Sequence, residues 1–266
     1  MASDQSNNQS VERAISVLRA FLTGRPELRV SDVAKATGLG TSTASRLLAT
    51  LETLEFVERD EVSGLYRLGT APITLGGVAL NQNPVHREAR QIAQDLAGTL
   101  GLGVNVAVRR AESMFYLLNF EGRLAPRSFV LTGQRKPLYA TGIGKCLLLA
   151  LTPEERRELL PEMRPFTSRT IVTHDALDRE LAATTGRGYA TEVEELAFGR
   201  ACVAAPIRDM SGTIVAAISI SGPLSAIDLE AREAELARTI IETADSISIG
   251  LGYVGPVHAV AASGRP

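Results

Sequence analysis

Hydroxyl side chains followed by a cation give residues 41–46 the chemistry to contact a nucleic acid. The run begins with Thr41, Ser42 and Thr43 and ends with Ser45 and Arg46. Hydroxyl groups hydrogen-bond phosphate oxygens, and free N–H groups at the start of a helix favour the same anion. Arginine can bond the O6 and N7 edge of guanine, and serine can pair with several bases. We therefore expect Ser45 and Arg46 to face the major groove of DNA.

Three predicted helices and a hairpin position this run. Apolar residues recur at intervals of three and four in each helix, which predicts helices at 10–22, 31–37 and 41–55. Ser10 and Ser31 are the expected N-caps of the first two. Two short strands, 56–59 and 65–68, follow around a polar turn. Helix, helix, turn, helix and hairpin is the order of a winged helix-turn-helix.

The connection between the second and third helices suits a steep helix crossing. Ala34 and Gly38 are small, so two backbones can approach, and glycine tolerates a positive φ in the turn. Lys35 and a hairpin arginine, Arg59 or Arg67, are then expected to contact phosphates. The alternative is a capped helix pair in a bundle. Thr-Ser-Thr-Ala-Ser is a poor helix start for that purpose, which favours the DNA interpretation.

The distribution of charge is uneven, although the net charge is only −2. Between Arg13 and Arg46, six basic residues stand against two acidic ones, and the stretch that follows is acidic. One face of a small domain can therefore be positive while the whole domain is nearly neutral. Ordinary surface charge is the alternative, and these counts alone favour it.

Composition excludes several classes of protein. A chain of 266 residues with 45% hydrophobic residues predicts two globular domains rather than disorder. The longest apolar run is far shorter than the roughly 20 residues of a membrane helix, and the first residues do not resemble a signal peptide. We therefore expect a cytoplasmic protein without a membrane partner. Two cysteines and three histidines have neither disulfide nor zinc-ligand spacing, so we expect no metal and no cofactor.

Catalytic motifs fail on their spacing. The TGIGKC segment at residues 141–146 partly matches a P-loop. The first glycine of that motif falls on Tyr139, and Cys146 stands where the motif requires Ser or Thr after the lysine. The histidines are too scattered to propose a catalytic triad. Glu192, Glu194 and Glu195 are interpreted as a solvated loop. A small-molecule-converting enzyme, and a ligand-binding or interaction module without DNA function, remain the alternative functions.

From residue 103 onward the pattern changes to strands. Apolar segments predict strands at 104–108, 114–118, 128–132, 188–191, 201–207 and 214–220. Helices are expected at 154–160, 176–184 and 229–251. These elements predict an α+β domain around a mainly antiparallel sheet. The predicted organisation is a disordered N-terminus at 1–9, the winged helix-turn-helix at 10–71, a linker helix at 72–84, the second domain at 85–253 and a flexible tail at 254–266.

Two serines of one predicted strand are suited to bind an anion. Ser219 and Ser221 are two residues apart, so their hydroxyls point to the same face of an otherwise apolar strand. Buried hydroxyls without partners cost free energy, and a carboxylate would satisfy them. Gly142 and Gly144 at a helix start leave N–H groups open for an anion. The alternative, that the serines bond neighbouring backbone and the glycines allow tight packing, stays open for each residue.

Long stretches of the chain resemble the IclR family of bacterial transcriptional regulators. The likeness starts with VERAISVLRAFLTGRPELRVSDVAKATGLGTSTASRLLATLETLEFVERD and continues through LTGQRKPLYATGIGKCLLLAL. Its most specific part is GRACVAAPIRDMSGTIVAAISISGP at residues 199–223. The resemblance covers nearly the whole chain, from Ser10 to about Tyr253.

The resemblance implies a GAF-like second domain that binds a small organic effector, often a carboxylic acid. Matching motifs place the effector-binding residues at Thr141, Gly142, Ile143, Glu192, Cys202, Ser219 and Ser221. Glu192 stands where the family pattern has Asp, and Ile143 replaces a smaller residue, so pocket size and preferred acid can differ. The expected function is a ligand-responsive regulator without enzymatic activity. One recognition helix reads few base pairs, so a homodimer on palindromic operator DNA is expected, and the resemblance also permits a tetramer.

Overall fold

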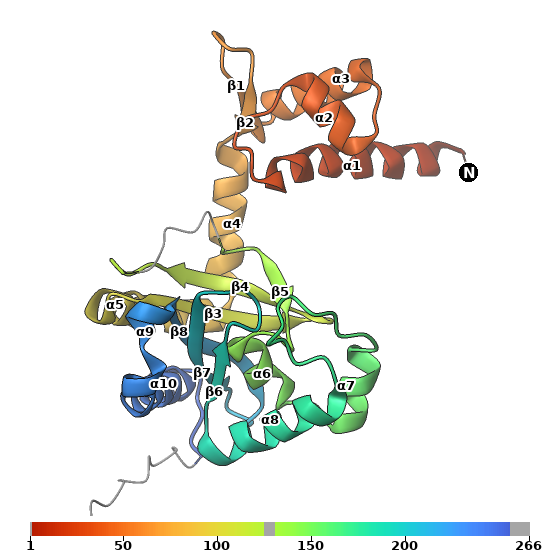
Figure 1. Cartoon of the computed structure of the whole chain (residues 1–266). Coiled ribbons are helices and arrows are strands. Elements are labelled where there is room, and N and C mark those ends of the chain that lie inside the picture. The colour runs from red at the N-terminus through yellow and green to blue at the C-terminus, as the bar shows by residue number, and fades with distance from the viewer. Residues whose placement is uncertain (1, 125–130, 256–266) are drawn as a thin grey trace, which may run out of the picture. The chain divides into compact units, whose positions relative to one another are not determined.

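The structure is a computed structural model that describes residues 2–124 and 131–255 of the chain (Figure 1). The chain divides into two compact units between Gln82 and Asn83. That division lies within the segment 72–84, where the sequence predicts the linker.

The first unit consists of helices and a small hairpin in the predicted order. Its elements are α1 (Ala2–Ala20), the 3₁₀ helix η1 (Phe21–Thr23), α2 (Val30–Thr37), α3 (Thr41–Thr53), β1 (Val57–Arg59), β2 (Tyr66–Leu68) and α4 (Thr70–Gln82). Helix α1 begins at Ala2 and runs through Ser10, so the expectation of a cap at Ser10 is wrong. The polar start of the chain continues the helical pattern instead of ending it.

The turn between α2 and α3 has the geometry expected for a helix-turn-helix. Gly38 ends α2 with a φ of +69°, and its N–H donates to the carbonyl of Ala34. The predicted cap at Ser31 is wrong, because Asp32 reaches back to accept the backbone N–H of Arg29 at 3.0 Å. The three helices enclose one apolar core, whose buried members include Val17, Phe21, Val33, Ala44, Leu48 and Leu51.

The hairpin is anchored to the segment before α2. Strands β1 and β2 are antiparallel, with Glu58 opposite Arg67. Leu28 pairs with Tyr66 through two backbone hydrogen bonds of 2.8 and 2.9 Å. This bridge adds a third short strand segment, which supports the wing of a winged helix-turn-helix.

The second unit is built on one six-stranded sheet with the order β5-β4-β3-β8-β7-β6, and every neighbouring pair is antiparallel. Its strands are β3 (Gly103–Arg110), β4 (Ser113–Phe120), β5 (Arg135–Pro137), β6 (Ala190–Val193), β7 (Arg200–Arg208) and β8 (Ile214–Pro223). Its helices are α5 (Pro84–Leu100), α6 (Gly142–Leu148), α7 (Pro153–Leu159), α8 (His174–Arg187), α9 (Leu224–Ile227) and α10 (Leu229–Gly250). These elements confirm the predicted α+β class with a mainly antiparallel sheet.

One predicted strand differs from the structure. In the predicted strand 128–132, residues 128–130 lie outside the described residues, and Leu131 and Thr132 are not in a strand. The edge of the sheet is instead formed by β5, which pairs with β4. Only three residues long, β5 gives too little alternation to predict it from the sequence.

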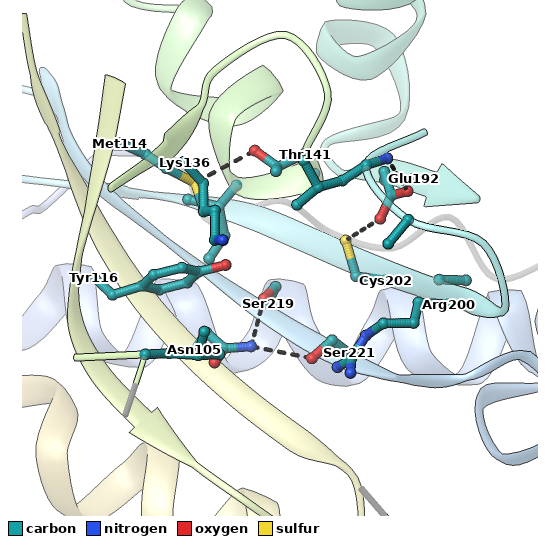
Figure 2. Close-up of a pocket in the computed structure, with 16 residues that line it drawn as sticks. Asn105, Met114, Tyr116, Lys136, Thr141, Glu192, Arg200, Cys202, Ser219 and Ser221 are labelled. Atoms are coloured by element: carbon teal, nitrogen blue, oxygen red, sulfur yellow. Dashed lines mark hydrogen bonds between the residues drawn. The ribbon is translucent and has the colours of Figure 1, made fainter. Parts of the chain in front are cut away.

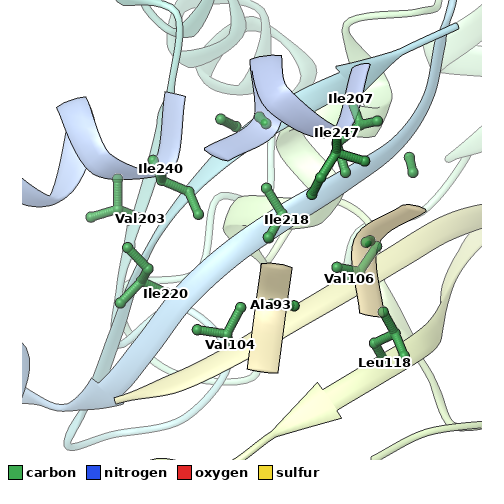
Figure 3. Close-up of a cluster of buried hydrophobic side chains, with 14 of the residues drawn as sticks. Ala93, Val104, Val106, Leu118, Val203, Ile207, Ile218, Ile220, Ile240 and Ile247 are labelled. Atoms are coloured by element: carbon green, nitrogen blue, oxygen red, sulfur yellow. The ribbon is translucent and has the colours of Figure 1, made fainter. Parts of the chain in front are cut away.

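The sheet separates two apolar layers, because successive side chains of a strand point to opposite faces. On one face, valines and isoleucines of the central strands pack against α5 and α10; the strand residues include Val104, Val106, Val203, Ile218 and Ile220, and α10 contributes Ile240 and Ile247 (Figure 3). On the other face, Ala107, Ala204 and Ala217 meet Leu147 of α6 and Leu177 of α8. Each fully buried Val or Ile contributes about 1.5–3 kcal/mol, so these layers hold the central strands rigidly.

Replacement of Gly144 by alanine tests how tightly α6 is seated. A Cβ at this position would lie 2.0 Å from the carbonyl oxygen of Leu138, so backbone must move. We expect Gly144→Ala to lower the free energy of unfolding of the full chain by about 1–3 kcal/mol in urea titration. Gly186→Ala in α8 is the matched control, because nothing lies within 4 Å of its Cβ position. Equal stability of the two variants would contradict this packing.

Candidate functional site

Helix α3 presents its predicted DNA-contacting residues on its solvent side. Thr41, Ser42, Ser45 and Arg46 are exposed, and Thr43 is half-buried. The N-cap residue of α3 is a glycine, so no side chain caps the first turn. The exposed face therefore offers backbone N–H groups, hydroxyls and one guanidinium group, which are the donors that phosphates and base edges accept.

The two other predicted phosphate contacts differ in their surroundings. Lys35 is exposed on α2. Arg67 is exposed on the wing, but its Nε bonds a carboxylate oxygen of Glu58 on the neighbouring strand. This hydrogen bond and the charge of Glu58 raise the pKa of Arg67. A phosphate must therefore compete with Glu58 for Arg67, which the sequence pattern did not indicate.

All seven residues predicted to bind the effector line one cavity of about 190 Å³ in the second unit (Figure 2). Nine further residues line the cavity and were not predicted from the sequence: Asn105, Met114, Tyr116, Leu131, Lys136, Leu196, Ala197, Arg200 and Ala201. The cavity lies on the face of the sheet that carries α6, with residues of β3, β4, β7 and β8 contributing to it. Residues far apart in the sequence therefore form one site.

A chain of side-chain hydrogen bonds orients the two serines toward the cavity. Asn119 Nδ2 donates to Asn105 Oδ1 at 2.8 Å. Asn105 Nδ2 in turn donates to Ser221 Oγ at 3.0 Å and to Ser219 Oγ at 3.5 Å. Since each serine oxygen accepts a hydrogen bond, its own O–H remains a donor for a group in the cavity. A polar residue between Val104 and Val106 was the signal that could have predicted the role of Asn105.

The first turn of α6 shapes the wall of the cavity and does not form an open binding site for an anion. Thr141 Oγ1 accepts the N–H of Gly144 at 3.0 Å and donates to the carbonyl of Pro137 at 3.1 Å. The N–H of Gly144 is therefore already used, and the expectation that it stays open for an anion is wrong. Gly142 lies against Cys202, because an added Cβ would be 2.8 Å from Sγ. The glycines allow this close approach, and Ile143 is buried beside them.

Glu192 is buried beside Cys202. One carboxylate oxygen of Glu192 accepts the N–H groups of Glu195 and Leu196 at 2.6 and 3.3 Å, and the other lies 3.7 Å from Cys202 Sγ. Burial raises the pKa of Glu192, and burial together with the nearby Glu192 raises the pKa of Cys202. Cys202 is therefore a neutral thiol in the wall of the cavity and lacks the thiolate that a nucleophile needs.

The carboxylate cluster is not a solvated loop, as the sequence suggested. Glu192 and Glu195 are only 7% and 8% exposed. Glu195 Oε1 lies 2.5 Å from Nζ of the buried Lys145, which also donates to the carbonyl of Thr191 at 3.1 Å. Lys145, which the sequence indicated only as part of an incomplete P-loop motif, thus ties α6 to β6 and to the turn that follows it.

Replacement of Glu192 by glutamine tests the raised pKa. The folded protein holds this proton more tightly than the unfolded chain, whose glutamate has a pKa near 4.5. The stabilisation that comes from this bound proton is fully present below the unfolded pKa and is lost as pH rises through the higher folded pKa. Glutamine keeps an oxygen for the two N–H groups and stays neutral.

We therefore expect Glu192→Gln to gain stability relative to the original chain between pH 5 and pH 8, measured as the urea midpoint. The exposed Glu242 provides the matched control variant, Glu242→Gln. If the stability advantage of Glu192→Gln over the original chain shrank as pH rose, the stated direction of the Glu192 pKa shift would be wrong.

None of the helices in residues 2–124 and 131–255 is long and apolar enough to cross a membrane. Within the same residues, histidine, cysteine and acidic side chains form no group of three or more that could hold a metal ion.

Two family models match the chain. Residues 10–61 match the IclR helix-turn-helix domain, and residues 77–249 match the C-terminal domain of the bacterial transcriptional regulator IclR. The HTH-type transcriptional regulator XynR of Escherichia coli is 31% identical over 92% of this chain and 98% of its own length. The glycerol operon regulatory protein of Streptomyces coelicolor is 34% identical over 92% of this chain and 97% of its own length.

A solved structure agrees with these matches. The crystal structure of Thermotoga maritima IclR superposes with a TM-score of 0.79 and 29% identity, over 92% of this chain and 99% of that one. The relatives are named regulators and not enzymes, which confirms the expected absence of enzymatic activity. With a helix-turn-helix domain followed by an effector-binding domain, the chain belongs to the IclR family of bacterial transcriptional regulators.

Proposed function

We propose that this regulator binds palindromic operator DNA as a homodimer, with α3 of each copy in the major groove. The exposed hydroxyls of α3 and Arg46 support this proposal, because they face solvent while Ala44 and Leu48 bury the opposite side of the helix. Lys35 and Arg67 are the proposed phosphate contacts. A regulator that binds chromosomal DNA works in the cytoplasm.

Exposed apolar side chains support dimer formation. On α1, Val11 and Ile15 are 63% and 48% exposed. On α4, Ile73, Leu75 and Val78 are more than half exposed, and α4 has no buried residue among those described. Apolar side chains of this kind at helix spacing are stabilised by burial against a second copy. A tetramer is a further assembly that the family resemblance permits.

We further propose that the cavity of the second unit binds a small organic acid. The observation that carries this proposal is the donor arrangement of Ser219 and Ser221, which accept from Asn105 and keep their O–H groups for the cavity. Carboxylate oxygens accept such donors well. The other predicted effector contacts, Thr141, Gly142, Ile143, Glu192 and Cys202, form the surrounding wall.

The effector alters DNA affinity only if it binds one arrangement of the protein better than another. The coupling free energy between the two sites then cannot exceed the difference in effector binding free energy between these arrangements. The effector and the operator must shift each other's affinity by the same factor. Binding of an acid without any change in DNA affinity would exclude this regulatory role while leaving the cavity as a binding site.

Replacement of Arg46 by alanine tests base reading. We expect a loss of about 1–3 kcal/mol in binding to the operator and a relaxed preference at one base pair. The measurement is a mobility shift with DNA from upstream of the protein's own gene and with single-base variants of it. Lys35→Ala serves for comparison, since loss of a phosphate contact weakens all sequences equally and makes the salt dependence shallower. The same behaviour in Arg46→Ala would make Arg46 a phosphate contact.

Replacement of both Ser219 and Ser221 by alanine tests the effector site. We expect the double variant to lose roughly tenfold or more in affinity for carboxylic acids, since hydrogen bonds to charged groups contribute about 1.5–3 kcal/mol. DNA affinity without effector stays unchanged in the same mobility-shift assay. Ser211→Ala, in an exposed turn, is the control. Loss of DNA binding together with acid binding would assign the two serines a structural role.

A further inference from the structure

Two cations reach the cavity from strands that are far apart in the sheet. Lys136 lies on the edge strand β5, and Arg200 starts β7. Strands β4, β3 and β8 lie between them, so at roughly 4.8 Å per strand their backbones are roughly 19 Å apart along the sheet. Figure 2 shows Lys136 entering beside Met114 and Tyr116, and Arg200 extending toward Ser221.

Neither cation is neutralised by the protein. In the part of the chain that the structure describes, Lys136 and Arg200 take part in no ion pair and no side-chain hydrogen bond. Both side chains are half-buried. Of the described residues that line the cavity, Glu192 alone carries a carboxylate, and its oxygens face backbone N–H groups and Cys202. Partly desolvated cations without partners favour an incoming anion.

Between the two cations the wall of the cavity is mainly apolar. Met114, Tyr116, Leu131, Ile143 and Leu196 line it. At about 190 Å³ the cavity is smaller than the roughly 300–1,000 Å³ of sites for drug-sized ligands. It is suited to a short carbon skeleton with charged groups at its ends.

We propose that the effector is a small dicarboxylic acid. One carboxylate binds Ser219, Ser221 and Arg200, and the other binds Lys136. This inference rests on the proposed effector site and adds the requirement for a second anionic group at the far end. It makes Lys136 the residue that distinguishes diacids from monoacids.

The test compares matched pairs of acids on the full chain. Linear diacids of three to six carbons are paired with monoacids of the same carbon number, and terephthalate is paired with benzoate. Calorimetric titration gives the affinities. Lys136→Met removes the charge and retains an apolar chain. Arg135→Met is the control, because this neighbour is exposed and bonds the carbonyl of Arg110 and the hydroxyl of Ser113 instead of the cavity.

We expect at least one diacid to bind the original chain about tenfold or more tightly than its paired monoacid. Lys136→Met should remove that preference by weakening diacid binding, with monoacid affinity changed less than about twofold. Arg135→Met should behave as the original chain does, and Lys136→Arg should restore most of the preference.

The outcomes separate the two proposals. If monoacids bind and no diacid exceeds its partner, or if Lys136→Met leaves the preference intact, the dicarboxylate inference is wrong and the effector site stands. If no acid of either kind binds, the proposed effector class fails and the dicarboxylate inference fails with it.

Discussion

The two-residue period of an antiparallel strand is the constraint on which the second unit depends. Along β8, Ile218 and Ile220 pack into the core beneath α5 and α10, so Ser219 and Ser221 must point to the opposite face. Register pairs Asn105 of β3 with Ser219. A slip of one residue would bury the polar side chains in the apolar layer and turn aliphatic ones into the cavity. The same packing that stabilises the domain therefore fixes the donors of the site.

Buried charge holds the rest of the cavity in place. Lys145 is 1% exposed and lies between Glu195 and the carbonyl of Thr191. Removal of one partner of a buried ion pair leaves an uncompensated charge, which is far more costly than the pair itself. The pair therefore fixes the first turns of α6 relative to β6, which carries Glu192. Gly144 adds a second restraint, because its close approach to the Leu138 carbonyl leaves no space for a side chain.

The sequence predicted elements well where the information is local. The apolar period of α3 and the alternation of β7 and β8 depend on neighbours within a few residues, so their existence was predictable. The paired serines were also visible from spacing alone. Contacts made across the sheet were not visible, because they depend on register. Asn105, Lys136 and Arg200 enter the cavity from separate strands. The polar Asn105 stands out between two valines, whereas nothing in the immediate neighbours of Lys136 and Arg200 marks them.

Local reasoning also failed where an isolated pattern had two meanings. Ser10 was interpreted as the start of the first helix, but α1 runs through it. Glycines before a helix were interpreted as open donors, although Thr141 takes the N–H of Gly144. The acidic cluster at Glu192 and Glu195 was interpreted as solvated because Lys145 is distant in the sequence. For the acidic cluster, a partner far along the sequence decided the conformation.

The strand that carries the two serines belongs to a continuous packed layer that reaches the start of the second unit. The reverse side of β8 packs on α10, which packs on α5. Helix α5 starts at Pro84, directly after the division between the two units. A ligand that displaced β8 would therefore act on close-packed isoleucines that extend to the helix nearest the DNA-binding unit in the sequence.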